Sequence, residues 1–288
     1  MTEPLLRVSG LAKRFKAFTL EDVSFDLPGG LMMGLIGANG AGKTTLVKAI
    51  LGLVPVRSGS LQFKGRDLLT EGAELRRHIA YVPDEPRFVP EMKLKAIQAA
   101  YARFFEDWND GRWQQLMADF GLDANAKAGT LSLGMRTKFA LTLALSRNAE
   151  LLVLDEPTTG LDPVFRRDLL KELRGLIQDE TRSILFSTHI TSDLEDRADL
   201  VTLLHKGRVI FSLDQDSLRE EWALVKGAPD VLDREIRPLF AGLRETPLGF
   251  EGLARTQHLS AFSRDVLIER PSLEDILVLM GKGNAHAC

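Results

Sequence analysis

Four residues near the start of the chain have the types and the spacing of a phosphate-binding loop. Gly37, Gly42, Lys43 and Thr44 fit the pattern G-x-x-x-x-G-K-[ST]. Glycines let the backbone turn so that successive N–H groups point at one anion, and a helix beginning just beyond adds its positive end. The lysine can reach the outer phosphates of a nucleotide, and the threonine hydroxyl can bind Mg²⁺. An apolar strand expected before the loop and a helix expected over residues 44–53 favour phosphate binding over an ordinary glycine-rich turn.

Two acidic residues at the end of an apolar run could supply the metal ligand and the water-positioning group that hydrolysis requires. Residues 151–154 are Leu, Leu, Val and Leu, typical of a buried parallel strand, and Asp155 and Glu156 follow them. In open α/β sheets, ligands bind beyond the carboxyl ends of the strands. Asp155 could hold Mg²⁺, and Glu156 could orient water at a γ-phosphate. The alternative is an acidic strand end that only turns at Pro157, which the upstream phosphate loop disfavours.

Two more groups have a placement that suits an anion. His189 closes an expected strand, residues 183–189, so it would lie at the same sheet edge and could contact the γ-phosphate. Ser132 and Gly134 come just before an expected helix, and Ser132 lies 23 residues before Asp155. A serine N-cap together with the helix N-terminus can form an anion site. A structural histidine and an ordinary N-cap are the alternatives.

The elements that would position these residues alternate between strands and helices, which predicts an α/β fold. Residues 5–15 and 20–30 alternate and turn like an antiparallel strand pair. Residues 91–120 change character and look helical. Their aromatic side chains are expected to form a helical core rather than a ligand site. They are Tyr101, Phe104, Phe105, Trp108 and Trp113.

The second half of the chain continues this pattern and then loosens. Helices are expected over 163–178 and 191–197, followed by a hairpin over 200–212. After about residue 215, a strand pair around 246–269 and a helix over 271–282 suggest a small α+β appendage. We therefore predict a first domain, residues 1–215, with a helical subdomain inserted at about 85–149. Residues 216–288 form the predicted accessory domain.

The composition narrows the class of protein. The chain has 288 residues, and its formal net charge of -3 argues against nucleic acid as the main partner. The one cysteine, Cys288, cannot form an internal disulfide. The N-terminus does not resemble a signal peptide, and no window approaches 18 apolar residues. A role at the membrane would therefore need a partner chain.

Five ordered motifs carry a resemblance to a known family. They are GANGAGKT, LSLGM, LLVLDE, GLDP and STH. In this order they resemble the ATP-binding subunit of an ABC transporter over about residues 4–215, and the tail is similar to that of bacterial exporter-type ATPases. The resemblance implies a P-loop NTPase core, with a mostly parallel sheet flanked by helices, an antiparallel β subdomain and a helical subdomain.

The resemblance also implies the partners and the location. It implies a head-to-tail dimer, in which ATP lies between the phosphate loop of one chain and Ser132 and Gly134 of a second ATP-binding subunit, either a copy or a sister chain. ATP would close the dimer, and hydrolysis would reopen it and drive a separate transmembrane permease. The protein would be cytoplasmic and peripheral on the inner face of the cell membrane. No nucleic acid is expected.

Individual roles follow residue by residue. Glu156 would polarise the water, His189 would act beside it, and Asp162 would link the two sites. Mg²⁺ would be held by Thr44 and Asp155. The predicted ATP contacts are Phe15, Gly37, Ala38, Asn39, Gly40, Ala41, Gly42, Lys43, Thr44, Thr45, Ser132, Gly134 and Asp162.

The chain departs from the family pattern in three places. Asp84 stands where the family has glutamine, and could still contact Mg²⁺ or water while adding negative charge. Phe15 stands where a tyrosine usually stacks on adenine, and stacking needs only an aromatic face. Leu133 and Met135 replace the usual glycine and glutamine of the signature, while the serine and second glycine remain.

Two other functions are alternatives to that of a transporter subunit. One is a soluble ABC ATPase of translation or DNA repair, which the single ATPase half, the lack of heptads and the net charge disfavour. The other is a slowly hydrolysing nucleotide sensor, which Asp84 and Leu133 favour. Residues 83–92, with three prolines, form a stiff loop suited to docking a permease helix, although an ordinary surface loop would look the same.

Overall fold

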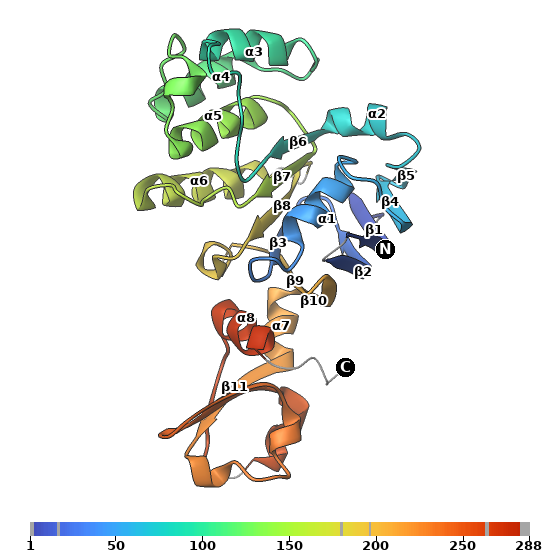
Figure 1. Ribbon diagram of the computed structural model, residues 1–288, viewed down its shortest axis with the longest axis vertical. Helices are drawn as coiled ribbons and strands as arrows, with labels where there is room; N and C mark the ends of the chain where they lie inside the picture. The colour runs from blue at the N-terminus through green and yellow to red at the C-terminus, as the bar shows by residue number, and fades with distance from the viewer. Residues whose placement is uncertain (1–2, 16–17, 179–180, 196, 263–264, 283–288) are drawn as a thin grey trace.

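The computed structural model describes residues 3–15, 18–178, 181–195, 197–262 and 265–282. In these residues, three sheets and the helices that flank them form an elongated molecule (Figure 1). Helices α3, α4 and α5 lie at one end and the C-terminal sheet at the other, with the largest sheet between them (Figure 1). Within the described residues, no helix is both long enough and apolar enough to cross a membrane.

The central sheet has six strands in the order β10-β9-β3-β8-β7-β6. Strands β6, β7, β8, β3 and β9 are parallel, and β10 pairs with β9 in the antiparallel sense. The bounds of its strands are β3 Met32–Ile36, β6 Ile79–Val82, β7 Leu151–Asp155, β8 Ser183–Thr188, β9 Leu200–His205 and β10 Arg208–Asp214. Because β3, β7 and β8 are neighbouring parallel strands, their carboxyl ends share one edge.

Both faces of this sheet are covered, which explains the continuous apolar runs. Leu152 and Leu154 of β7 pack in one cluster with helices α5 and α6. Leu151 and Val153 of the same strand pack on the other face with α1 and an antiparallel sheet. That sheet has the order β2-β1-β4-β5. The bounds are β1 Leu6–Arg14, β2 Thr19–Leu27, β4 Ser58–Phe63, β5 Arg66–Asp67, α1 Lys43–Ile50, α2 Gly72–Leu75, α5 Leu133–Leu145 and α6 Pro163–Leu176.

The helical segment contains α3 Leu94–Ala102 and α4 Asp110–Asp119, so the helical pattern expected over 91–120 is interrupted after Ala102. Residues 107–109 pair with the end of α5, where Asn109 N–H donates to Ser146 O (2.8 Å). This tertiary pairing overrides the local helical preference. Most of the aromatic residues are core as expected, but Phe104 is 75% exposed, which corrects that prediction.

The C-terminal part forms a four-stranded antiparallel sheet in the order β12-β13-β11-β14, with helices α7 and α8 between it and the central sheet (Figure 1). The predicted strand pair around 246–269 is wrong in its pairing, because β13 and β14 both pair with β11 and not with each other. The bounds are α7 Gln215–Glu221, β11 Trp222–Gly227, β12 Phe240–Thr246, β13 Gly249–Arg255, β14 Leu267–Glu269 and α8 Leu273–Lys282.

The α/β fold class is confirmed, whereas the domain boundary at residue 215 stays a prediction. Leu218 of α7 and Ile276 of α8 belong to the same apolar cluster as the central sheet. The helix expected over 191–197 is wrong, because the described residues of that range form a 3₁₀ turn, η3 Thr191–Asp193, and no α-helix. The carbonyls of Leu194 and Glu195, which follow this turn, also accept from the side chain of Gln215 in α7.

Candidate functional site

The phosphate loop leaves β3 and enters α1, and two glycines are required by its surroundings. A Cβ on Gly37 would lie 2.3 Å from the carbonyl oxygen of Leu204, so no side chain fits there. Gly42 has φ +109°, and a Cβ on it would lie 2.4 Å from the ring of Phe18. Gly207 N–H donates to Ala41 O (2.9 Å), which fixes the loop against the turn between β9 and β10. The sequence pattern therefore reflects close approach of backbone and positive φ.

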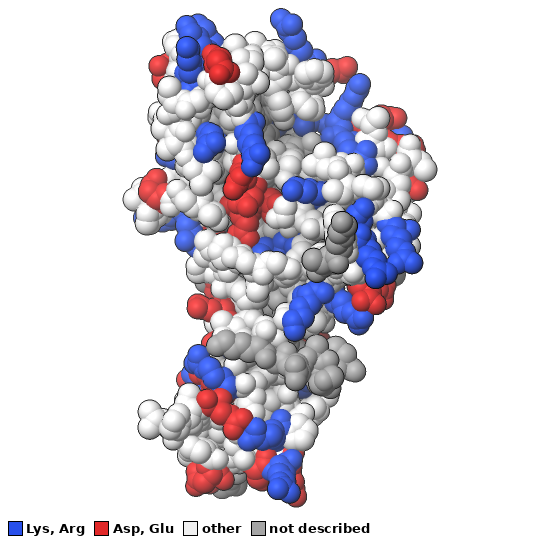
Figure 2. All heavy atoms as spheres, viewed as in Figure 1, with Lys and Arg blue, Asp and Glu red and all other residues white. Residues whose placement is uncertain are grey.

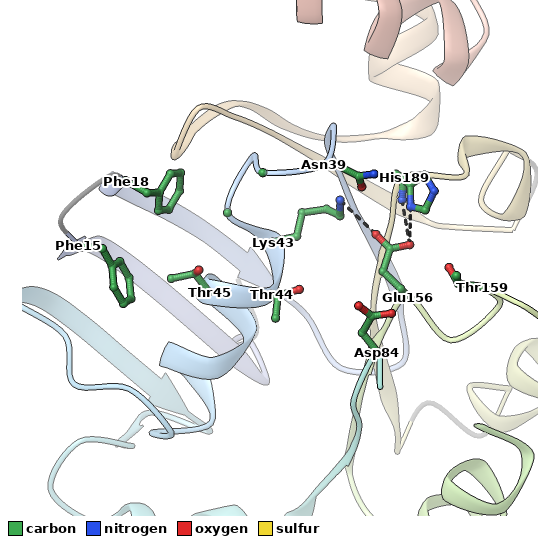
Figure 3. Close-up of a pocket in the computed structure, with 12 residues that line it drawn as sticks. Phe15, Phe18, Asn39, Lys43, Thr44, Thr45, Asp84, Glu156, Thr159 and His189 are labelled. Atoms are coloured by element: carbon green, nitrogen blue, oxygen red, sulfur yellow. Dashed lines mark hydrogen bonds and ion pairs between the residues drawn. The ribbon is translucent and has the colours of Figure 1, made fainter. Parts of the chain in front are cut away.

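Lys43, Glu156 and His189 meet where the three central strands end (Figure 3). Lys43 Nζ donates to Gly37 O (2.7 Å) and pairs with Glu156 Oε1 (3.1 Å). His189 Nδ1 lies 2.8 Å from Glu156 Oε2, and its backbone N–H also faces that oxygen (3.3 Å). Both oxygens of the Glu156 carboxylate are therefore engaged, one by the phosphate loop and one by the end of β8.

The backbone of Glu156 explains where its side chain points. Glu156 has φ +49°, a conformation that few residues other than glycine adopt. Its N–H donates to Ser187 O (2.8 Å), so the turn after β7 is held against β8. Backbone strain of this kind clusters at functional sites, where the surrounding structure enforces it.

Asp155 lies beneath this network and is fully buried. Ser187 Oγ donates to its Oδ1 (2.9 Å), whereas Oδ2 has no hydrogen bond of normal geometry to a described residue. Burial raises the pKa of the Asp155 carboxyl, the Thr44 and Ser187 hydroxyls oppose that shift, and the charges of Asp84 and Glu156 add to it. Oδ2 of the Asp155 carboxylate is therefore available to a further ligand.

Asp84 follows β6 and reaches the same space (Figure 3). Partial burial raises the pKa of its carboxyl, and the negative charges of Glu156 and Glu85 raise it further. His189 and Lys43 act in the opposite direction. Asp84, which departs from the family pattern, therefore lies inside the site, where its carboxyl is close to that of Glu156.

One end of a pocket of about 690 Å³ is lined by Asp84, Glu156 and His189. Phe15 and Phe18 lie on the opposite side of the pocket from Glu156 and His189, with Lys43 between them (Figure 3). Phe15 is 41% exposed, as an aromatic available for stacking would be. The pocket is lined by Phe15, Phe18, Asn39, Gly40, Gly42, Lys43, Thr44, Thr45, Asp84, Glu156, Thr159 and His189.

Sequence reasoning missed Phe18 and Thr159. Phe18 directly precedes β2, and its carbonyl accepts from Phe15 N–H (2.7 Å), so the two residues lie side by side next to the pair that β1 forms with β2. An aromatic on each side of an expected turn was the signal that could have found it. Thr159 lies between the motifs LLVLDE and GLDP, where the sequence pattern names no ligand. Of the predicted contacts, Gly37, Ala38 and Ala41 shape the loop rather than line the pocket.

Three predicted contacts lie elsewhere on this chain. Ser132 caps α5 by accepting from Met135 N–H (3.3 Å), and Asp162 caps α6 by accepting from Phe165 N–H (2.9 Å). The hydrogen bond from Phe165 N–H is also the main reason that the pKa of the Asp162 carboxyl is lowered. Gly134 faces Gly160 O, which a Cβ would approach to 3.2 Å. None of the three lines the pocket of its own chain.

The described residues fit Mg²⁺ only together with an anionic ligand. No group of three or more His, Cys, Asp or Glu side chains in the described part of the chain is arranged to hold a metal ion. The unpartnered Oδ2 of Asp155 and the nearby Thr44 hydroxyl would be two oxygen ligands, and phosphate oxygens would complete the shell. The donor set is therefore that of a magnesium–nucleotide site.

A phosphate loop after β3, an acidic pair after β7 and a histidine after β8 define a P-loop nucleotide-binding protein. Comparison with known proteins narrows this class. The family described as ABC transporter matches residues 20–159. The chain is 33% identical over 212 residues to the uncharacterized ABC transporter ATP-binding protein YdbJ of Bacillus subtilis, covering 73% of this chain and 69% of that protein. The chain belongs to the family of ABC transporter ATP-binding proteins.

Two other comparisons agree with this assignment. The Nod factor export ATP-binding protein I of Ralstonia nicotianae is 32% identical over 213 residues, covering 72% of this chain and 66% of that protein. A solved structure described as the ATP binding subunit of an ABC transporter aligns with a TM-score of 0.67 and 31% identity. That alignment covers 75% of this chain and 92% of the other.

The buried Asp155 carboxylate predicts an effect on stability. A carboxyl whose pKa is raised in the folded state destabilises that state as pH rises from its unfolded pKa to its folded pKa, and the penalty stays above that range. Asp155→Asn removes the ionisation, and Ser187 can still donate to the amide oxygen. We expect the variant to melt at a higher temperature than wild type at pH 7 without nucleotide, with the difference shrinking near pH 4.

Scanning calorimetry at both pH values measures this difference. Asp168→Asn is the matched control, because the Asp168 side chain is 61% exposed and its neutralisation should leave the melting temperature unchanged. A lower melting temperature for Asp155→Asn at pH 7 would show that its carboxylate is already compensated.

Proposed function

We propose that this chain is the ATP-hydrolysing subunit of an ABC transporter, and that it drives a separate membrane permease in the direction of export. The observation that carries the proposal is the contact of Glu156 with both Lys43 and His189 at the end of a pocket of nucleotide size. Export is favoured because a relative of similar length bears a name that specifies export. The identity of the substrate would be set in the permease.

The roles follow from where the charges lie. Lys43 belongs to the phosphate loop and pairs with Glu156. The β- and γ-phosphates of ATP would therefore compete with Glu156 for the ammonium group of Lys43. Once Lys43 turns to the phosphates, Glu156 Oε1 is available to hold the attacking water and draw its proton. His189 keeps its contact with Oε2 and so fixes the direction of the carboxylate.

Mg²⁺ bound by Thr44, Asp155 and the phosphates would neutralise negative charge at the γ-phosphate. Asp84 would lie near this ion or its water, where a cation would favour the ionised form of the Asp84 carboxyl. Phe15 and Phe18 would hold the base at the other end of the pocket. The substrate is ATP with magnesium.

A second ATP-binding subunit would complete the site. Ser132 at the tip of α5 is exposed, its neighbours Leu133 and Met135 are 40% and 37% exposed, and none of them faces the chain's own pocket. Placed head to tail, the α5 tip of one chain would cover the phosphates bound by the other, and Asp162 would lie between the sites. The permease would hold this pair at the inner face of the cell membrane.

Glu156→Gln tests the catalytic assignment. An amide keeps the shape of the carboxylate but cannot take the proton, so we expect the rate of ATP hydrolysis to fall by about 100-fold or more. ATP affinity should stay within a few-fold of wild type. Phosphate release and nucleotide titration measure the two quantities, with Glu235→Gln, an exposed site in the C-terminal part, as control. Hydrolysis at the wild-type rate by Glu156→Gln would remove Glu156 from the mechanism.

The head-to-tail dimer makes a separate prediction. Glu156→Gln with ATP should elute as a dimer in size exclusion with light scattering, because unhydrolysed ATP joins the two chains. Adding Ser132→Arg places a bulky cation at the tip of α5 and should return the protein to monomers. Adding Gln114→Arg, on the exposed side of α4, should leave the dimer intact. A dimer that persists with Ser132→Arg would contradict this arrangement.

A further inference from the structure

The segment that carries His189 continues directly into the part of the chain that contacts the C-terminal helices. We call residues 189–195 the histidine segment. Its backbone is tied into one turn, since Asp193 N–H donates to Ile190 O (3.1 Å) and Leu194 N–H to Thr191 O (2.9 Å). Glu195 N–H also donates to Thr191 O (3.1 Å). A displacement at Glu195 would therefore move Thr191, two residues from the histidine.

Asp193 and Leu194 of the histidine segment contact the elements that carry the site. Asp193 is 1% exposed and accepts from Thr158 Oγ1 (2.6 Å), two residues after Glu156. The Arg166 guanidinium of α6 compensates the buried charge of Asp193. Leu194 packs over β3, where it leaves no room for a side chain on Gly34. The segment thus touches β3 and the turn after β7, two of the elements that form the site.

The back of the histidine segment is held by the C-terminal part. The Gln215 side chain, at the start of α7, donates from Nε2 to the carbonyls of Leu194 (3.0 Å), Glu195 (3.0 Å) and Ala198 (2.9 Å). Its Oε1 accepts from Arg219, so both ends of the amide have partners suited to them. The Leu194 carbonyl also accepts from the N–H groups of Arg197 and Ala198, so Gln215 adds a tertiary contact to a turn that has its own backbone bonds.

Helix α8 makes the second contact from the C-terminal part. The Glu195 carboxylate accepts the first N–H of α8, with Leu273 N 3.2 Å from each oxygen. A carboxylate at a helix N-terminus also interacts favourably with the helix dipole. Leu273 and Ile276 of α8 pack in one cluster with Leu194, so the contact is apolar as well as polar. In Figure 1, α7 and α8 lie together between the C-terminal sheet and the central sheet.

We propose that Gln215 is a positioning residue for His189, and that the C-terminal part of the chain sets the rate of ATP turnover through it. The inference rests on the proposed function, because it assigns a rate to the same site. Gln215 does not reach ATP. It fixes the turn that places the imidazole against Glu156. A shift of α7 and α8 would therefore change the alignment of His189 with Glu156.

The test compares full-length Gln215→Glu with the control Glu220→Gln, an exposed residue of the same helix. A glutamate at 215 has no N–H donors and would repel the three carbonyls. In hydrogen exchange without nucleotide, we expect amides of the histidine segment to exchange faster in Gln215→Glu and unchanged in the control. Unchanged exchange in both variants would overturn the proposal. This readout does not depend on hydrolysis, so it stands even if wild type hydrolyses no ATP and the proposed function fails.

Turnover supplies the second readout. We expect kcat for ATP hydrolysis to fall about tenfold in Gln215→Glu with KM within about twofold, because a small misplacement of a catalytic group lowers the rate more than binding. In a His189→Ala background, Gln215→Glu should lower the residual rate no further. Equal losses in both backgrounds would show a general structural role and overturn the proposal. Gln215→Leu, which removes the donors without adding charge, replaces Gln215→Glu if that variant does not fold.

Discussion

The buried ion pair between Lys43 and Glu156 is the interaction on which the rest of the site depends. The two side chains are 6% and 9% exposed, so neither charge is well solvated. Removing two charges from water costs several kcal/mol each, and only good geometry and further hydrogen bonds offset that cost. Gly37 O on the lysine side and His189 on the glutamate side supply those bonds. A polyanion that draws Lys43 away changes the partners of every group in this set.

The ion pair and His189 require three strand ends at one place, and the fold provides them. The phosphate loop follows β3, Glu156 follows β7 and His189 follows β8, and β8 lies between the other two strands in the sheet. Parallel strands buried on both faces bring their carboxyl ends to one edge without any residue of the site having to stabilise the sheet. The site can then keep strained and charged residues, such as Glu156 at positive φ, on a core that is stable by packing alone.

Much of this arrangement could be predicted from the sequence, since local chemistry dictates it. Gly37 and Gly42 were predicted from spacing, and each is required by a contact or by positive φ. The strand ends at Asp155 and His189 followed from apolar runs. Phe18 was missed because its place depends on the pairing of β1 with β2. The helix over 191–197 was predicted wrongly, because the described residues there form a 3₁₀ turn fixed by tertiary contacts. Asp193 accepts from Thr158 Oγ1 and pairs with Arg166, and neither partner is visible in the local pattern. Ser132, Gly134 and Asp162 stay predictions, since their proposed partner is a second chain.

In the proposed function, Lys43 leaves Glu156 to bind the phosphates of ATP. Calorimetric titration of Mg·ATP into wild type and Lys43→Ala tests it most directly, with Lys48→Ala on the exposed side of α1 as control. We expect Lys43→Ala to bind at least about tenfold more weakly, because it loses a charge-assisted contact to phosphate, and Lys48→Ala to bind like wild type. Equal affinity of Lys43→Ala and wild type would contradict the account, because the buried lysine would then serve only to neutralise Glu156.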